Sequence, residues 1–163
     1  MQHNLNILHD YCMKWKLTVN KDKAKILIFR KGGRIPDNLH FYYGNSEIEI
    51  VSQYCYLGVV MTTCGSWIEC QKTLAGQAQK AIYKLKSYLF KYTNLSVEHV
   101  LELFDKLVKL ILFYSCEIWG FTQASVIERI HTMFCKSVLC IKTATQNDFV
   151  NGELGISPTN LYC

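Results

Sequence analysis

The sequence S-Q-Y-C-Y-L-G-V-V-M-T-T, residues 52–63, marks the point where the chain changes character. Aromatic and β-branched residues dominate it, which predicts a β-strand. Gly58 interrupts the pattern, and a glycine inside a strand usually marks a bulge or a place where another backbone approaches closely. Short strands and lysine-rich turns are expected before this stretch, and helical periodicity after it. The stretch is therefore the boundary between a half rich in short strands and a helical half.

The composition is that of a folded chain. A length of 163 residues suits one domain, or one and a half. Half of the residues are apolar, which is enough for a core, and only 19 % are charged. The low charge and the two prolines argue against disorder.

Basic residues are concentrated near the N-terminus. The net charge is +5, from 18 Lys and Arg against 13 Asp and Glu. Only Asp10 and Asp22 oppose the eight basic residues up to position 34, which are Lys14, Lys16, Lys21, Lys23, Lys25, Arg30, Lys31 and Arg34. A local basic region points to nucleic acid better than a global charge does, but a solvated face is the simpler interpretation of the charge alone.

The eight cysteines follow no disulfide or metal pattern. There is no C-x-x-C, and several cysteines fall on apolar faces, where a thiol behaves as a small hydrophobe. Residues 1–10 are polar and lack the apolar core of a signal peptide. We therefore expect reduced thiols in an intracellular protein of the nucleus or cytoplasm, not a secreted one.

Metal and membrane sites are both disfavoured. His131, Cys135 and Cys140 form H-x3-C-x4-C, but no fourth ligand is evident, and Cys140 is expected to face away from the other two. The most apolar run, residues 107–121, is broken by Lys109 and Glu117, whereas a membrane span needs roughly 20 mostly apolar residues. We interpret this run as a core helix.

The first half is expected to contain one helix and several short strands. Leu5, Leu8, Cys12 and Trp15 predict a helix over residues 4–16, and residues 24–30 form an apolar strand before a loop at 31–38. Gly44-Asn45 predicts a hairpin between residues 39–43 and 46–51. Glu47 and Glu49 share the wet face of that hairpin; a paired-carboxylate site is conceivable there, but a solvated edge is favoured.

The second half is expected to be helical. A long helix over residues 66–92 places Lys80, Lys84 and Lys91 on one side, where they are either solvated or able to follow a phosphate backbone. Ser96 is a suitable N-cap for a second helix over 97–120. Because that helix is apolar nearly all round from Leu107, it is expected at the centre of this half. A third helix over 124–141 and a short element at 147–155 follow.

These elements predict an α+β fold. A small N-terminal helix, antiparallel strands and a hairpin make up residues 1–63, and a three-helix bundle makes up residues 64–163. No G-x-x-x-x-G-K-[ST], G-x-S-x-G or H-E-x-x-H occurs, so none of these three catalytic or phosphate-binding motifs is present.

Several short motifs, in order and at consistent spacing, carry a resemblance to a known family. They are Leu8-His9-Asp10-Tyr11-Cys12, Trp15-Lys16-Leu17-Thr18-Val19-Asn20-x-x-Lys23-x-Lys25, Tyr54-Cys55-Tyr56-Leu57-Gly58, Gln77-Ala78-Gln79-Lys80-Ala81, Tyr114-Ser115-Cys116-Glu117-Ile118-Trp119-Gly120-Phe121, Ile127-Glu128-Arg129-Ile130-His131, Phe134-Cys135-Lys136, Gln146-Asn147-Asp148-Phe149 and Gly152-Glu153-Leu154-Gly155. Together they resemble, nearly end to end, the C-terminal part of the reverse transcriptase of non-LTR (LINE-type) retrotransposons, from the end of the palm through the thumb.

The sequence departs from the family pattern at scattered positions. Ala24 stands where the family usually has Thr, and Leu110 where a Pro is usual. Asn151 precedes Gly152 in place of an aromatic residue, and Ile156 replaces a basic one. Such changes are typical either of an inactive copy or of divergence.

The resemblance implies binding without catalysis. Residues 1–63 would be a palm-end remnant with a primer-grip-like hairpin, and residues 64–163 a thumb-like domain. The family's catalytic aspartates, which hold Mg²⁺ in the full-length enzyme, lie in motifs absent here, so no catalytic residue, metal site or cofactor is expected in this chain. The residues implied to contact a template–primer duplex are Lys23, Lys25, Tyr56, Leu57, Gly58, Lys80, Lys84 and Lys91.

Two classes of function remain. The first is a fragment of an RNA-directed DNA polymerase that binds nucleic acid non-specifically and is inactive on its own. The alternative is a catalytically inert structural or protein-interaction domain, with the region 107–114 serving as core or as a dimer face.

Overall fold

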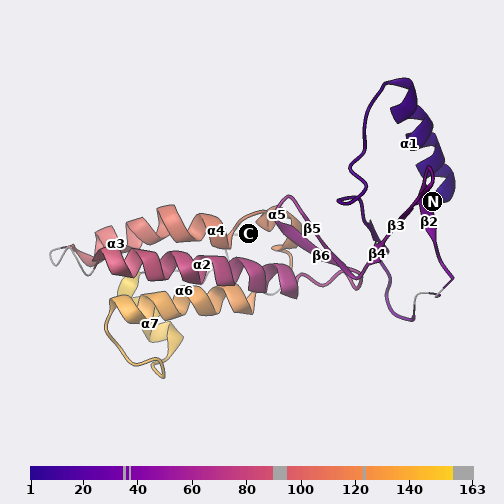
Figure 1. Ribbon diagram of the computed structural model, residues 1–163. Helices are drawn as coiled ribbons and strands as arrows, with labels where there is room; N and C mark the ends of the chain where they lie inside the picture. Colours follow the sequence, from indigo (N-terminus) through magenta and orange to yellow (C-terminus); the bar gives the residue numbers. More distant parts are fainter. Residues whose placement is uncertain (35, 37, 90–94, 123, 156–163) are drawn as a thin grey trace. The chain divides into compact units, whose positions relative to one another are not determined.

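The computed structural model describes residues 1–34, 36, 38–89, 95–122 and 124–155. Its helices and short strand pairs form a mixed α+β fold, as the sequence predicts (Figure 1). The chain divides into two compact units, Met1–Ser66 and Trp67–Cys163, where sequence analysis expects a boundary after residue 63. Each unit is described in turn.

The first unit begins with helix α1 (Gln2–Lys14), followed by three two-stranded pairings. The strands are β1 (Ile26–Leu27), β2 (Phe41–Tyr43), β3 (Ser46–Ile48), β4 (Ile50–Val51), β5 (Gln53–Tyr56) and β6 (Val59–Thr62). The predicted hairpin at Gly44-Asn45 is confirmed by the antiparallel pairing of β2 with β3. Gly44 has φ +58°, and a Cβ there would lie 2.9 Å from His9 Nε2, so a larger residue would clash.

Sequence analysis expects antiparallel strands, but β1 and β4 pair in parallel, with Ile26 opposite Ile50. Only two residues of the predicted strand 24–30 enter this ladder. A small core forms beside it from Ile26, Tyr43 and Ile48. The predicted apolar stripe of α1 is only partly buried, since Cys12 is buried but Leu8 and Trp15 are exposed.

The second unit is helical. Its elements are α2 (Ile68–Leu89), α3 (Val97–Phe104), the π-helix η1 (Asp105–Lys109), α4 (Leu110–Leu112), α5 (Cys116–Trp119), α6 (Ser125–Val138) and α7 (Asn147–Leu154). Helices α2 and α6 lie side by side, and α2 also packs against η1 and α4. The core includes Leu74, Ala78, Ile82 and Leu85 of α2 and Phe134 of α6, with the Phe134 ring stacked on Phe104 at a centroid distance of 4.2 Å.

The expected continuous helix over 97–120 is wrong. Five residues adopt π-helix, and the helix then ends at Leu112; Ser115, with a left-handed φ of 54°, separates it from α5. Trp119 is fully buried after this break, and its Nε1–H donates to the Tyr114 carbonyl at 2.9 Å.

The expectation that residues 107–121 lie wholly at the centre is also wrong. Val108, Leu112 and Trp119 are buried, but several large apolar side chains of this segment are exposed to between 46 % and 92 %: Leu107, Leu110, Tyr114, Ile118 and Phe121. An exposed apolar group of this size commonly marks a surface that contacts another molecule.

The predicted elements at 66–92, 124–141 and 147–155 correspond to α2, α6 and α7, although α2 is described only to Leu89 and α6 ends at Val138. Ser96 caps α3, accepting a hydrogen bond from His99 N–H at 3.4 Å. Gly155, with φ 61°, ends α7 as a left-handed C-cap. Within the described part of the chain, none of the helices has the length and apolar composition needed to cross a membrane.

Candidate nucleic-acid interface

The stretch that sequence analysis interprets as one strand is a hairpin. Strands β5 and β6 pair in antiparallel register with Tyr56 opposite Val59, so Leu57 and Gly58 form a two-residue turn. Both turn residues have positive φ, 48° and 82°, as a type I′ turn requires. Gly58 therefore sits in a turn and not in a bulge.

The tip of this hairpin is apolar and exposed. Tyr56 is 56 % exposed and Leu57 is 72 % exposed. Leucine is an unfavourable residue in a left-handed turn, which normally takes Asn, Asp or Gly. An exposed leucine in left-handed backbone makes the tip a candidate contact surface.

Lys23 is positioned next to the same hairpin. The Tyr54 hydroxyl of β5 donates a hydrogen bond to the Lys23 carbonyl at 3.1 Å. The Lys23 N–H donates in turn to Asn20 Oδ1 at 3.2 Å, which closes an Asx turn. The backbone of the lysine is thus fixed to the hairpin at one end and to the turn at the other, while its side chain is exposed.

Lys25 is in a different situation. Its Nζ lies 2.6 Å from Glu49 Oε2, and its side chain is only 28 % exposed. Much of its charge is therefore matched within the protein. Glu47, the other carboxylate of this wet face, pairs with His40 Nδ1 at 2.5 Å, so each glutamate has a basic partner and the two do not form an acid–base dyad.

A second set of candidate residues lies on α2. Lys80 and Lys84 are exposed, and no ion pair among the described residues includes either of them. Two aromatic residues that sequence analysis did not select are exposed on the same helix, Tyr83 at 65 % and Tyr88 at 60 %. The sequence could have indicated them, since Tyr83 follows Lys80 by three residues and Tyr88 follows Lys84 by four. Residues at these spacings are neighbours on a helix surface. Lys91 lies outside the described residues.

The α2 surface combines the two properties that non-specific nucleic-acid binding uses. Lysines supply cations for phosphates, and tyrosines supply flat faces for bases or sugars. The hairpin tip with Lys23 in the first unit and Lys80, Tyr83, Lys84 and Tyr88 in the second form two separate candidate contact sets.

The histidine–cysteine pattern does not form a metal site in the described chain. His131 Nε2 and Cys135 Sγ lie 3.7 Å apart, buried beneath Phe104. Burial raises the pKa of the Cys135 thiol to about 11 and, with the charge of Lys109, lowers the pKa of His131. Cys140 is exposed, and no group of three or more His, Cys, Asp or Glu among the described residues could hold a metal ion.

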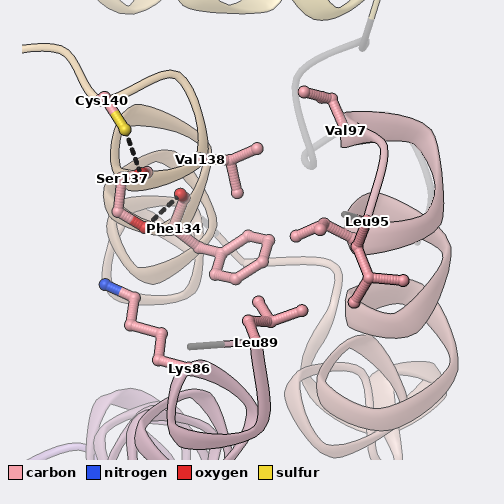
Figure 2. Close-up of a pocket in the computed structure, with 9 residues that line it drawn as sticks. Lys86, Leu89, Leu95, Val97, Phe134, Ser137, Val138 and Cys140 are labelled. Carbon is pink, nitrogen blue, oxygen red and sulfur yellow. Dashed lines mark hydrogen bonds between the residues drawn. The ribbon is translucent and has the colours of Figure 1, made fainter. Parts of the chain in front are cut away.

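The helical unit also contains an apolar cavity of about 330 Å³ between α2, α3 and α6. Figure 2 shows Leu89, Leu95 and Phe134 pointing toward its interior. Two of its polar groups are already bonded, since Ser137 Oγ donates to the Phe134 carbonyl at 2.7 Å and Cys140 Sγ to the Ser137 carbonyl at 3.8 Å. Lys86 is the remaining polar residue of the lining, so the cavity offers a single cation and not the convergent set of polar groups that fixes a specific polar ligand.

Comparison of the chain with protein-family models, with curated proteins and with solved structures found no match.

Proposed function

We propose that this chain is the palm-end and thumb region of a non-LTR reverse transcriptase and that it binds a template–primer duplex without catalysing synthesis. The observation that carries the proposal is the β5–β6 hairpin. Its exposed tip has the sequence Tyr56-Leu57-Gly58, and the Tyr54 hydroxyl bonds it to the backbone of Lys23. Two motifs that the resemblance implies to contact a template–primer duplex are thereby adjacent in one unit.

The α2 surface supports the same proposal. Lys80, Tyr83 and Lys84 are exposed, and none of the ion pairs between described residues occupies either lysine, so both charges can face a phosphate backbone. Contacts of this kind are independent of sequence and weaken steeply with salt.

Charge reversal on α2 tests the proposal. Lys80→Glu with Lys84→Glu should weaken binding of an RNA–DNA duplex by about tenfold or more, since two phosphate contacts become repulsive. Fluorescence anisotropy with a labelled duplex measures this. Lys106→Glu with Lys142→Glu is the matched control, because it changes the net charge equally at exposed lysines outside α2 and outside the N-terminal basic region. Equal loss in both variants would assign the effect to net charge and contradict the proposed surface.

Catalysis is expected to be absent. Asp10 contacts His9 at 3.7 Å and Asp22 lies in the turn capped by Asn20, while Asp37 lies outside the described residues. Two-metal phosphoryl transfer requires carboxylates that converge on the metals. Nucleotide incorporation by the chain alone, with Mg²⁺ and a primed RNA template, would overturn this part of the proposal.

The exposed apolar residues of the segment 107–121 favour a second candidate, an inert protein-interaction domain. Leu110 is 71 % exposed and Phe121 is 92 % exposed. If this segment is an interface between copies of the chain, the mass in solution should exceed that of a monomer, and Leu110→Lys should restore the monomer. Under this candidate the α2 charge reversal leaves all measured properties unchanged.

A further inference from the structure

A second, polar cavity of about 480 Å³ lies in the helical unit, between α6, α7 and the segment that connects them. Four of its lining residues recur along α6 at spacings of three or four, which places them on one face: Ser125, Arg129, Thr132 and Lys136. Thr143 and Asn147 face them from the connecting segment and from the start of α7. The polar groups of the lining are therefore two cations, three hydroxyls, one amide and the carboxylate of Glu128.

Lys136 is the unusual member of this set. Only 7 % of the residue is exposed, and its Nζ donates to the Thr143 carbonyl at 2.9 Å. An ammonium has three N–H donors, so one hydrogen bond leaves it under-satisfied. None of the ion pairs in the described chain includes Lys136. Burying a cation without a counter-charge is costly, and an anion in the cavity would supply the missing charge.

Arg129 adds a second cation to the same face. It is exposed, it lines the cavity, and no described ion pair includes it. The guanidinium presents a planar set of donors that matches phosphate oxygens, and Lys136 complements it as a point charge. Together they place one exposed and one buried positive charge at one cavity.

The N-terminus of α7 also favours an anion in this cavity. Asn147 is its first residue, and the preceding Gln146 makes no side-chain cap, so no side chain at that position satisfies the first N–H groups. Such N–H groups and the helix dipole favour an anion. The Asp148 carboxylate in the first turn of α7 and the Glu128 carboxylate in the lining oppose it, although Glu128 already has an interaction of its own within the protein.

We propose that this α6–α7 cavity binds a phosphate monoester group, with Lys136 as its buried cation and Arg129 as its exposed one. A monoester dianion matches two cations, whereas a cation would meet their repulsion. The cavity accommodates a terminal phosphate on three kinds of molecule: free phosphate, a nucleoside monophosphate or the 5′-phosphorylated end of a nucleic acid. The site is separate from the lysines of α2 and does not depend on the function proposed for them.

Titration of the full chain with inorganic phosphate, followed by two-dimensional NMR, tests the site. Saturable shifts are expected at residues that line the cavity, and chloride at equal ionic strength should not reproduce them. Arg129→Gln should weaken binding by about tenfold or more, as loss of a charge-assisted hydrogen bond implies. Because Arg129 is exposed, this variant keeps the fold, while Lys136→Met tests the buried charge with circular dichroism as the check on folding.

Lys142→Gln is the matched control, because Lys142 is an exposed cation of the connecting segment that does not line the cavity. It should bind phosphate as the unaltered chain does. A second arm compares a 5′-phosphorylated with a 5′-hydroxyl oligonucleotide, and adenosine monophosphate with adenosine. Preference for the phosphorylated member of one pair identifies the source of the phosphate.

The results separate this site from the α2 surface. Loss of phosphate binding in Arg129→Gln with duplex binding retained, and the reverse in the α2 double variant, support two independent sites. Absence of saturable shifts with phosphate, or equal weakening by Lys142→Gln and Arg129→Gln, would overturn the proposed cavity site whatever the α2 variants do.

Discussion

Leu57 is the residue where backbone strain and exposure coincide. Its φ of 48° lies in the left-handed region, and 72 % of its surface is exposed. A non-glycine residue in this conformation costs about 1–2 kcal/mol, least for Asn and Asp, whose side chains bond locally. The hairpin retains a leucine at this position, although Asn would suit the turn better.

Leu57→Asn should therefore raise the free energy of unfolding by about 0.5–1 kcal/mol. The same change at Leu110, which is also exposed but has a helical φ of −60°, should lower it by a few tenths of a kcal/mol, roughly the difference in helix propensity. Urea titration of both variants measures the difference. Destabilisation by Leu57→Asn would show that the leucine supports the fold and has no need of a functional explanation.

His131 makes stability depend on pH. Burial, and next the charge of Lys109, lower the pKa of His131 below its ordinary value, with Asp105 acting in the opposite direction. The unfolded chain therefore binds more protons than the folded chain below about pH 6.5, so this contribution to stability is present above that pH and is lost as the pH falls.

Chemical denaturation at about pH 7.5 and about pH 5.5 checks this dependence. The loss of stability on acidification should be smaller in His131→Gln than in the unaltered chain, because the variant has no buried imidazole to protonate. An equal loss in both proteins would assign the pH dependence to other groups.

At the scale of the elements, α3 depends on a local cap. The Ser96 hydroxyl accepts from the His99 N–H and lies 2.6 Å from the His99 ring nitrogen Nδ1. Ser96→Ala should lower the free energy of unfolding by about 1 kcal/mol, because an N-terminal donor of the helix loses its acceptor.

Ser87→Ala is the control for this substitution. The Ser87 hydroxyl donates to the Lys84 carbonyl at 2.7 Å within α2, a bond that leaves the helix no more stable than alanine does. Its effect on thermal or urea unfolding should stay within about 0.5 kcal/mol. A similar loss in both variants would contradict a specific role for the cap.

The elements with one buried face were predictable from the sequence. The apolar residues Leu74, Ala78, Ile82 and Leu85 of α2 recur at spacings of three and four, and all four are buried. The Gly44-Asn45 hairpin and the Ser96 cap follow from local chemistry that acts within a few residues. Hydrophobic periodicity and helix capping depend on residues close together in the sequence, so both can be recognised without knowledge of tertiary contacts.

The misjudged elements depend on backbone conformations that the side chains disfavour. Leu57 and Ser115 both adopt positive φ, one turning a predicted strand into a hairpin and the other ending a predicted helix. Neither residue type signals a left-handed conformation. The parallel pairing of Ile26 with Ile50 joins strands far apart in the sequence, and periodicity does not specify the direction of such a pairing. Both partners are β-branched and apolar, so they suit a parallel and an antiparallel ladder equally.

At the scale of the molecule, the sequence predicted which lysines are exposed better than it predicted which groups lie next to a lysine. Lys80 and Lys84 are exposed on α2, as the helical spacing implied. The sequence did not reveal that Lys25 is paired with Glu49, since that contact joins the residue before β1 to the residue before β4. Nor did it reveal the buried Lys136, whose position depends on how the connecting segment folds over α6.

The measurement that tests nucleic-acid binding most directly is its salt dependence in the full chain. Affinity for a template–primer duplex is measured at several salt concentrations, for the unaltered chain and for Lys80→Gln with Lys84→Gln. The account predicts a steep linear fall of log affinity with log salt, and a slope smaller by about two in the variant, roughly one per lost phosphate contact. Affinity that is indifferent to salt, or a slope that the variant leaves unchanged, would contradict the α2 surface as a phosphate-binding face.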